Sequence, residues 1–248
     1  MNDRTAIVTG GTRGIGKAIA SELCQRGARV CITARKDDEL AEAVRELDPD
    51  GRGRVIASRG SADDVEHQRA TVELVMCSWG RIDMLVNNAG TNTHFGSLLD
   101  AELASVRKTF EVNVHAVLSW TQLTWRAFQR ENGGAILNVA SLGGLVPSSM
   151  IGVYNCSKAA LIHLTRHLAA EMGPGTRVNA IAPAVVKTQF ARAIYEHDEP
   201  AVAARYPLQR LGLPQDAGKL AAFLLSDDAA WITGQTVVLD GGLMVAAG

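Results

Sequence analysis

The sequence predicts an α/β protein built on a doubly wound, seven-stranded parallel sheet flanked by helices. Two observations predict this class: short runs rich in β-branched residues alternate with amphipathic stretches, and seven such runs occur along the chain. Their nearly continuous apolar character is typical of strands that helices cover on both faces. Because the chain has 248 residues and is 47% hydrophobic, it can form one large core. We therefore expect a single domain over residues 1–248.

Each strand is predicted where β-branched and other apolar residues dominate a short run. The runs are Thr5–Thr9, Arg29–Thr33, Val55–Ser58, Met84–Asn87, Ala135–Ala140, Arg177–Ala182 and Thr236–Leu239. Helices are predicted between them, where apolar residues recur at three- and four-residue spacing and Gly or Pro bounds several ends. They are Ile15–Gln25, Asp37–Leu47, Val65–Trp79, Ala101–Gln129, Tyr154–Met172 and Gln215–Leu225.

Residues 188–214 interrupt this alternation. The segment carries two internal prolines and ends near a Gly-Leu-Pro turn. A long irregular segment in a compact α/β domain is often a lid over a binding site, so we predict a substrate lid at about residues 188–214. The alternative is a surface loop that has no role in binding.

Composition excludes several classes of function. A net charge of -1 and a pI near 6.6 give no general attraction to nucleic acid or to an anionic membrane. The N-terminus lacks a charged leader and apolar segment, and no apolar run is long enough to span a bilayer, so we expect a cytoplasmic protein with no membrane partner. Four cysteines without CxxC spacing predict reduced, buried thiols and no metal cluster: Cys24, Cys31, Cys77 and Cys156.

The first predicted strand ends in the turn TGGTRGIG, which leads directly into a helical pattern. Glycines permit a tight turn and close approach of the backbone to a ligand, and the helix N-terminus presents unpaired N–H groups to a pyrophosphate. The arrangement is typical of Rossmann-type nucleotide sites, while a turn that serves packing alone is the alternative. The residues assigned to the cofactor here are Gly10, Thr12, Arg13, Gly14, Ile15 and Gly16.

The end of the second predicted strand indicates which cofactor. Enzymes that use NAD place an acid there to hold the ribose 2′-hydroxyl, but this chain has Ala34, followed by Arg35 and Lys36. Arg35 can hold a 2′-phosphate through a charge-assisted contact that an acid would oppose. Arg13 is placed to reach the same phosphate from the glycine-rich turn. The predicted cofactor is therefore NADP(H).

Tyr154 and Lys158 lie one turn apart on the same face of a predicted helix. A phenol with a pKa of about 10 transfers protons poorly at neutral pH until a nearby cation favours the phenolate, and Lys158 is placed to supply that charge. Ser141 follows a predicted strand, at the sheet edge where ligands bind, and can donate to a developing alkoxide. Asn113 is a poor helix former within a long predicted helix, which indicates a role other than packing.

In their order and spacing, TGGTRGIG, NNAG at residues 87–90, the Ser141, Tyr154 and Lys158 set and the closing Asp-Gly-Gly resemble the short-chain dehydrogenase/reductase family. The resemblance covers residues 5–242. It implies that Tyr154 is the acid–base residue and that Lys158 lowers its pKa and binds the nicotinamide ribose. It further implies that Ser141 holds the substrate oxygen and that Asn113 retains a water in a proton relay to Lys158.

The same resemblance implies further contacts to the cofactor. They would come from Asn87, Ala89, Gly90, Pro183, Val186 and Thr188. Two positions depart from the family pattern. Gly60 stands where relatives place an Asp or Asn that binds the adenine. Asp63 lies three residues later, and we assign it to the cofactor. Ala184 replaces the usual glycine after Pro183, so a positive φ is not expected there.

We therefore predict hydride transfer between NADP(H) and a small carbonyl or secondary alcohol substrate. The family resemblance implies a homotetramer. We expect His94 to line the substrate cleft. His163 and His167 have metal-ligand spacing on one helix, but no third ligand is evident. Two alternatives remain: a 3-oxoacyl reductase acting on carrier-protein or coenzyme A thioesters, and a non-catalytic nucleotide-binding sensor. Carrier-protein reductases of this family carry docking arginines at the positions of Asn132 and Ala170, where this chain has none.

Overall fold

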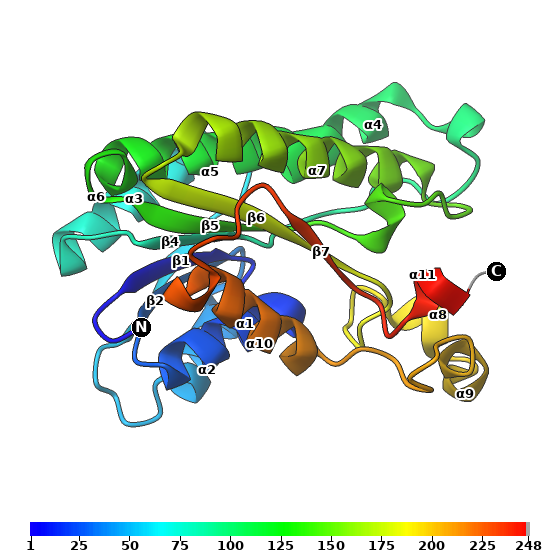
Figure 1. The fold of residues 1–248 in the computed structure, drawn as a ribbon, viewed down its shortest axis with the longest axis horizontal. Coiled ribbons are helices and arrows are strands. Elements are labelled where there is room, and N and C mark those ends of the chain that lie inside the picture. Colours follow the sequence, from blue (N-terminus) through cyan, green and yellow to red (C-terminus); the bar gives the residue numbers. More distant parts are fainter. Residues whose placement is uncertain (247–248) are drawn as a thin grey trace.

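The computed structural model describes residues 1–246, and a seven-stranded parallel sheet in the order β3-β2-β1-β4-β5-β6-β7 forms its centre (Figure 1). The predicted fold class is confirmed, and each strand boundary lies within one residue of its predicted position. The strands are β1 (Thr5–Thr9), β2 (Arg29–Ala34), β3 (Val55–Arg59), β4 (Met84–Asn87), β5 (Gly134–Val139), β6 (Thr176–Pro183) and β7 (Thr236–Leu239).

Helices cover both faces of the sheet (Figure 1). One face carries α1 (Gly14–Gln25), α2 (Asp37–Leu47) and α10 (Pro214–Leu225). The other carries α3 (Val65–Trp79), α5 (Ala116–Thr124) and α7 (Gly152–Met172). A separate apolar cluster fills the space under each layer, with Leu23 and Leu225 in the first and Trp120 and Met172 in the second. The central strands are buried on both faces, whereas the edge strands β3 and β7 are partly exposed because each lacks a neighbour on one side.

The long helix predicted over Ala101–Gln129 is interrupted in the structure. It comprises α4 (Leu103–Phe110), a π-helical turn over 111–115, α5, a second π-helical turn over 125–129 and the short α6 (Arg130–Asn132). The first π turn contains Asn113, whose buried side chain is held by the segment that follows β4. Such bulges are frequent at functional sites.

The segment predicted as a lid leaves the sheet after β6 and contains two short helices, α8 (Arg192–Tyr195) and α9 (Glu199–Ala203). Its base is closed by a parallel bridge between Val186 and Gly212. Tyr206, which is buried, anchors its middle. Figure 1 shows these helices beside α11 (Leu243–Ala246), beyond the end of β7.

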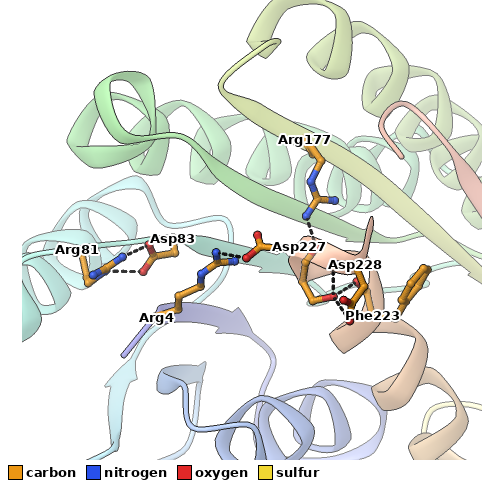
Figure 2. Close-up of polar contacts among 8 residues, drawn as sticks. Arg4, Arg81, Asp83, Arg177, Phe223, Asp227 and Asp228 are labelled. Atoms are coloured by element: carbon orange, nitrogen blue, oxygen red, sulfur yellow. Dashed lines mark hydrogen bonds and ion pairs between the residues drawn. The ribbon is translucent and has the colours of Figure 1, made fainter. Parts of the chain in front are cut away.

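Polar contacts tie together the amino-terminal edge of the sheet (Figure 2). The Asp83 carboxylate accepts bonds from Arg81 at 2.7 and 2.8 Å and from the Thr5 amide at 2.7 Å. Arg177 donates to backbone carbonyls at the end of α10, and Arg4 pairs with Asp227 at 2.6 Å. The strand order reverses between β1 and β4. A crevice for a ligand is expected at the carboxyl ends of these two strands, opposite the polar contacts of Figure 2.

Two of the cysteine predictions are wrong. Cys31 is buried in β2, but Cys77 and Cys156 are exposed because they occupy solvent-facing positions of α3 and α7. Within residues 1–246, no helix combines the length and apolar character that a bilayer crossing requires.

Candidate active site

The turn between β1 and α1 has the shape that a bound phosphate requires. Gly10 and Gly14 have φ values of +64° and +56°, which only glycine adopts without strain. A Cβ on Gly16 would lie 2.2 Å from the Gly10 carbonyl oxygen, so this position excludes every larger residue. At the start of α1 the N-cap residue Arg13 makes no side-chain capping bond. The N–H groups of the first turn therefore fit a pyrophosphate.

Asn88, which sequence reasoning passed over, joins this turn to the end of β4. Its Nδ2 donates to the Thr9 and Gly10 carbonyls at 2.9 and 3.0 Å, and Thr9 Oγ1 accepts from the Asn88 and Ala89 amides at 3.0 Å. The predicted Asn87 differs, because its side chain is buried in the sheet and donates to Asn138 at 2.9 Å. The NNAG motif contained both asparagines, but the sequence does not reveal which of them bonds to the glycine turn.

The cations predicted for the 2′-phosphate gather beside β2. Lys36 Nζ lies 2.8 Å from Glu39 Oε1, and Arg13 Nη1 lies 3.7 Å from the same oxygen. Arg13 also donates to Gln189, at the start of the predicted lid, at 2.9 Å. Arg35 directly follows β2, and its backbone carbonyl accepts from Arg59. The structure thus brings two of the three predicted cations to one carboxylate that the sequence analysis did not single out.

The predicted catalytic set lies at the carboxyl edge of β5 and the start of α7. Lys158 Nζ lies 5.6 Å from the centre of the Tyr154 ring and donates to the Val139 carbonyl at 2.7 Å. Ser141 follows β5, and its Oγ accepts from the Gly143 amide at 3.2 Å. Strand, loop and helix therefore present a hydroxyl, a phenol and an ammonium to one region.

Burial dominates the proton affinities of these groups. It raises the pKa of Tyr154 to about 12, although a hydrogen bond with Ser141 acts in the opposite direction. It lowers the pKa of Lys158 to about 8. The direction at Tyr154 is opposite to the one implied by the family resemblance, because loss of solvation outweighs stabilisation of the phenolate while Lys158 donates to Val139. The phenol is consequently protonated at neutral pH.

Asn113 connects this set to the segment after β4. Its Oδ1 accepts from the Thr91 amide at 2.8 Å, and its Nδ2 donates to the Thr91 carbonyl and to Ser157 Oγ, each at 2.9 Å. A Cβ on Gly90 would lie 3.4 Å from both Asn113 Oδ1 and Lys158 Nζ. The predicted Gly90, Asn113 and Lys158 therefore meet around one point.

The other residues predicted to contact the nicotinamide half of the cofactor lie at the end of β6 and in the segment after it. Pro183 ends this strand and Val186 is buried behind it. Thr188 lies across from the glycine turn, since a Cβ on Gly14 would be 3.2 Å from its methyl group. The backbone at Ala184 has no positive φ, as expected.

The structure explains the departure at Gly60 and places Asp63 beside it. A Cβ on Gly60 would lie 2.1 Å from the His67 ring, so the imidazole occupies the space of a side chain there. The Asp63 carboxylate is bound by Ser61 and Lys108, which links the end of β3 to α4.

Apolar and aromatic side chains border the catalytic set on the side of the predicted lid. The Phe190 ring lies 5.9 Å from the Tyr154 ring and is 63% exposed. His94 is half-buried, and its Nε2 lies 2.9 Å from the Ser97 carbonyl oxygen within its own loop. This loop is joined to the loop before α7 by a bond from the Gly96 amide to the Met150 carbonyl.

Comparison with known proteins covers nearly the whole chain. A family model described as enoyl-(acyl carrier protein) reductase matches residues 10–244. The chain is 38% identical to dehydrogenase/reductase SDR family member 4 of Oryctolagus cuniculus over 247 residues, which are 98% of this chain and 94% of the relative. The Homo sapiens protein of the same name is 37% identical, with coverage of 98% and 88%.

Solved structures agree. A short-chain type dehydrogenase/reductase from Mycobacterium ulcerans has a TM-score of 0.93 at 33% identity, covering 99% of this chain and 91% of that one. ElxO with NADP bound has a TM-score of 0.90 at 28% identity, covering 99% and 100%. Sequence, fold and arrangement of the site thus lead to one conclusion: the chain belongs to the short-chain dehydrogenase/reductase family.

Proposed function

We propose that the protein is an NADP(H)-dependent oxidoreductase that transfers a hydride between the nicotinamide and a carbonyl or secondary alcohol carbon, with Tyr154 as the acid–base residue. The observation that carries the proposal is the position of Ser141, Tyr154 and Lys158 at the carboxyl ends of the strands. The glycine turn that fits a pyrophosphate lies at the same ends of the sheet. A sensor without catalysis would not need a half-buried phenol beside a buried ammonium, since burial of an ionisable group is costly.

In this proposal the nicotinamide supplies or accepts the hydride. Ser141 Oγ holds the substrate oxygen, and the Tyr154 hydroxyl delivers its proton as negative charge develops there. Lys158 then stabilises the phenolate, which is costly to form in a buried place. Asn113 holds the Thr91 segment at the mouth of a proton path to Lys158.

The proposed cofactor preference rests on charge near β2. Arg35, Lys36 and Arg13 would bind the ribose 2′-phosphate, and a structural neighbour, ElxO, binds NADP. We expect kcat/KM with NADPH to exceed that with NADH by about one to two orders of magnitude, because each charge-assisted contact contributes roughly 1.5–3 kcal/mol. Arg35→Ala should reduce the preference. Equal use of the two cofactors by the unmodified enzyme would contradict the assignment.

The test of the reaction class is a panel of ketones, aldehydes and coenzyme A thioesters incubated with NADPH and followed by loss of reduced-nicotinamide absorbance. Turnover of free carbonyls, absent in Tyr154→Phe, is the expected result. Tight NADPH binding without turnover of any carbonyl would instead support the nucleotide-binding sensor.

The description of the matching family model names an acyl carrier protein substrate, but for an enoyl reductase, which reduces a carbon–carbon double bond rather than the 3-oxo group of the thioester alternative. We place the thioester alternative second, because the two positions at which docking arginines are expected hold Asn132 and Ala170. We also propose, from the family resemblance, a cytoplasmic homotetramer. Its interfaces would be α4 and α5 with α7, and α10 with β7, and residues 188–214 would act as a lid over one continuous domain.

A further inference from the structure

A carboxylate lies among the groups to which we assign the ribose 2′-phosphate. Glu39, in the first turn of α2, places Oε1 2.8 Å from Lys36 Nζ and 3.7 Å from Arg13 Nη1. Its Oε2 accepts from Thr12 Oγ1 at 3.4 Å. Three residues assigned to the cofactor from the sequence thus converge on one acid that had no assigned role.

The contacts of Glu39 are of the kind that a phosphate makes. Both groups are anionic and accept charge-assisted bonds from ammonium and guanidinium donors. The Glu39 side chain is 27% exposed, against 59% for Arg13 and 65% for Lys36, so the carboxylate lies beneath its two cations. The bond from Lys36 is the main cause that lowers the pKa of Glu39, with smaller contributions from Arg13 and an opposing one from Asp38. Glu39 is therefore an anion throughout the neutral range.

Two consequences of this arrangement are possible in principle, and they have opposite signs. Glu39 could hold Arg13 and Lys36 in place for the phosphate, in which case its loss would weaken NADPH binding. Alternatively, it competes with the phosphate for the same donors and repels the incoming charge. The second reading fits the geometry better, because the carboxylate contacts Thr12, Arg13 and Lys36 at once, by hydrogen bonds from Thr12 and Lys36 and an ion pair with Arg13, rather than orienting one of them.

Building on the proposed NADP(H) function, we propose that Glu39 is an internal competitor of the ribose 2′-phosphate and sets how strongly the enzyme prefers NADPH over NADH. Binding of NADPH exchanges the Glu39 carboxylate for the phosphate at Arg13 and Lys36. NADH carries a 2′-hydroxyl, which leaves these ion pairs intact. Glu39 therefore lowers the affinity for the phosphorylated cofactor selectively.

The experiment compares Glu39→Gln with the unmodified protein and with Glu42→Gln, a matched charge change at an exposed position one turn further along α2. Dissociation constants are measured by calorimetry for NADPH, NADH and two fragments, adenosine 2′,5′-bisphosphate and 5′-AMP. We expect Glu39→Gln to tighten NADPH and the bisphosphate by about 3- to 10-fold, the range for two partly exposed ion pairs. NADH and 5′-AMP should change less than about twofold, and the gain should shrink as salt is raised.

Weaker binding of NADPH by Glu39→Gln would assign Glu39 to positioning and overturn the proposal. Equal changes for all four ligands, or the same gain in Glu42→Gln, would overturn it as well. The proposed cofactor is judged separately, by the ratio of NADH to NADPH dissociation constants in the unmodified protein. A ratio near one there would contradict the NADP(H) assignment, while an increase of that ratio in Glu39→Gln would still support the role of Glu39.

Discussion

At the scale of single residues, the proposed active site combines the half-buried Tyr154 and the buried Lys158, whose pKa values are displaced in opposite directions. Tyr154 is harder to ionise than a free phenol, and Lys158 is easier to deprotonate than a free amine. Both shifts have the same cause, because a poorly solvated environment disfavours the charged form of either group. The phenol is thus protonated at neutral pH, and in the proposed mechanism the neighbouring Lys158 stabilises its anion.

The simplest residue-level prediction removes the donor. Tyr154→Phe keeps the ring, its contact with Phe190 and its position on α7, but lacks the hydroxyl. Turnover should fall by at least about 10²-fold, the low end for general acid–base catalysis, while the dissociation constant for NADPH changes little. Steady-state kinetics measure the turnover, and a binding titration measures the NADPH dissociation constant. A near-normal kcat would show that another group delivers the proton.

A second prediction concerns stability. Since burial lowers the pKa of Lys158 from 10.5 to about 8, protonated Lys158 destabilises the fold by up to roughly 3 kcal/mol. Between these two values the unfolded chain binds more protons than the folded one, so the Lys158 contribution makes stability rise with pH there. Lys158→Met should therefore stabilise the cofactor-free protein at pH 7, and the difference from the unmodified protein should vanish near pH 10.5.

Urea unfolding at a series of pH values measures this difference. Lys219→Met, at an exposed position of α10, is the control for loss of one positive charge and should show no comparable trend. The bond from Lys158 to the Val139 carbonyl works against the gain. A destabilised Lys158→Met protein at pH 7 would mean that this bond outweighs the cost of burying the charge.

At the scale of elements, the π turn over 111–115 is the feature that joins helix geometry to the site. One extra residue in the turn leaves Asn113 with its amide toward Thr91 rather than into solvent. The side chain acts as a bridge between the helix and the backbone after β4. A regular α-helix through the same residues would rotate Asn113 away from that backbone.

Asn113→Ala leaves the Thr91 amide and carbonyl without these partners. We expect a loss of about 2–4 kcal/mol in the free energy of unfolding, because two partly buried backbone groups left without partners are costly, together with a fall in kcat. Gln122→Ala, at an exposed position of α5, controls for helix propensity and should change neither. Thermal unfolding and initial rates give the comparison; a variant with full stability would show that the π turn does not depend on this bridge.

At the scale of the whole molecule, the two edges of the sheet have different tasks. Ion pairs and backbone bonds close the amino-terminal ends of the strands (Figure 2), whereas the proposed catalytic and cofactor-binding groups lie at the carboxyl ends. The strand order places the ends of β1 and β4 side by side, so Asn88 can hold the glycine turn. The polar contacts of Figure 2 therefore lie at the opposite end of the strands from the proposed site.

The surface also bears on the substrate. Carrier-protein docking needs basic side chains at the mouth of the cleft and is sensitive to salt. Asn132 ends α6 with its amide bonded to the Phe128 carbonyl, and the nearby Arg130 lies over the Trp125 ring at 5.5 Å. We therefore expect free ketones or short coenzyme A thioesters to be reduced at least as well as a carrier-protein thioester. Arg130 and Arg166 are the basic residues near Asn132 and Ala170 in the sequence. A preference for the carrier-protein form, abolished by salt or by replacing these two arginines, would reverse this order.

The sequence by itself determined the strands and most helices, because burial in a parallel sheet imposes a local apolar pattern that composition and spacing reveal. It also determined the order of the motifs, and so the family. Only the tertiary structure decided contacts between segments distant in the chain. These include the bonds of Asn88 to the glycine turn, the filling of the Gly60 space by His67, the π turn at Asn113 and the meeting of Arg13 and Lys36 at Glu39. Each depends on which way a side chain faces once the strands are ordered, and no local pattern encodes that direction.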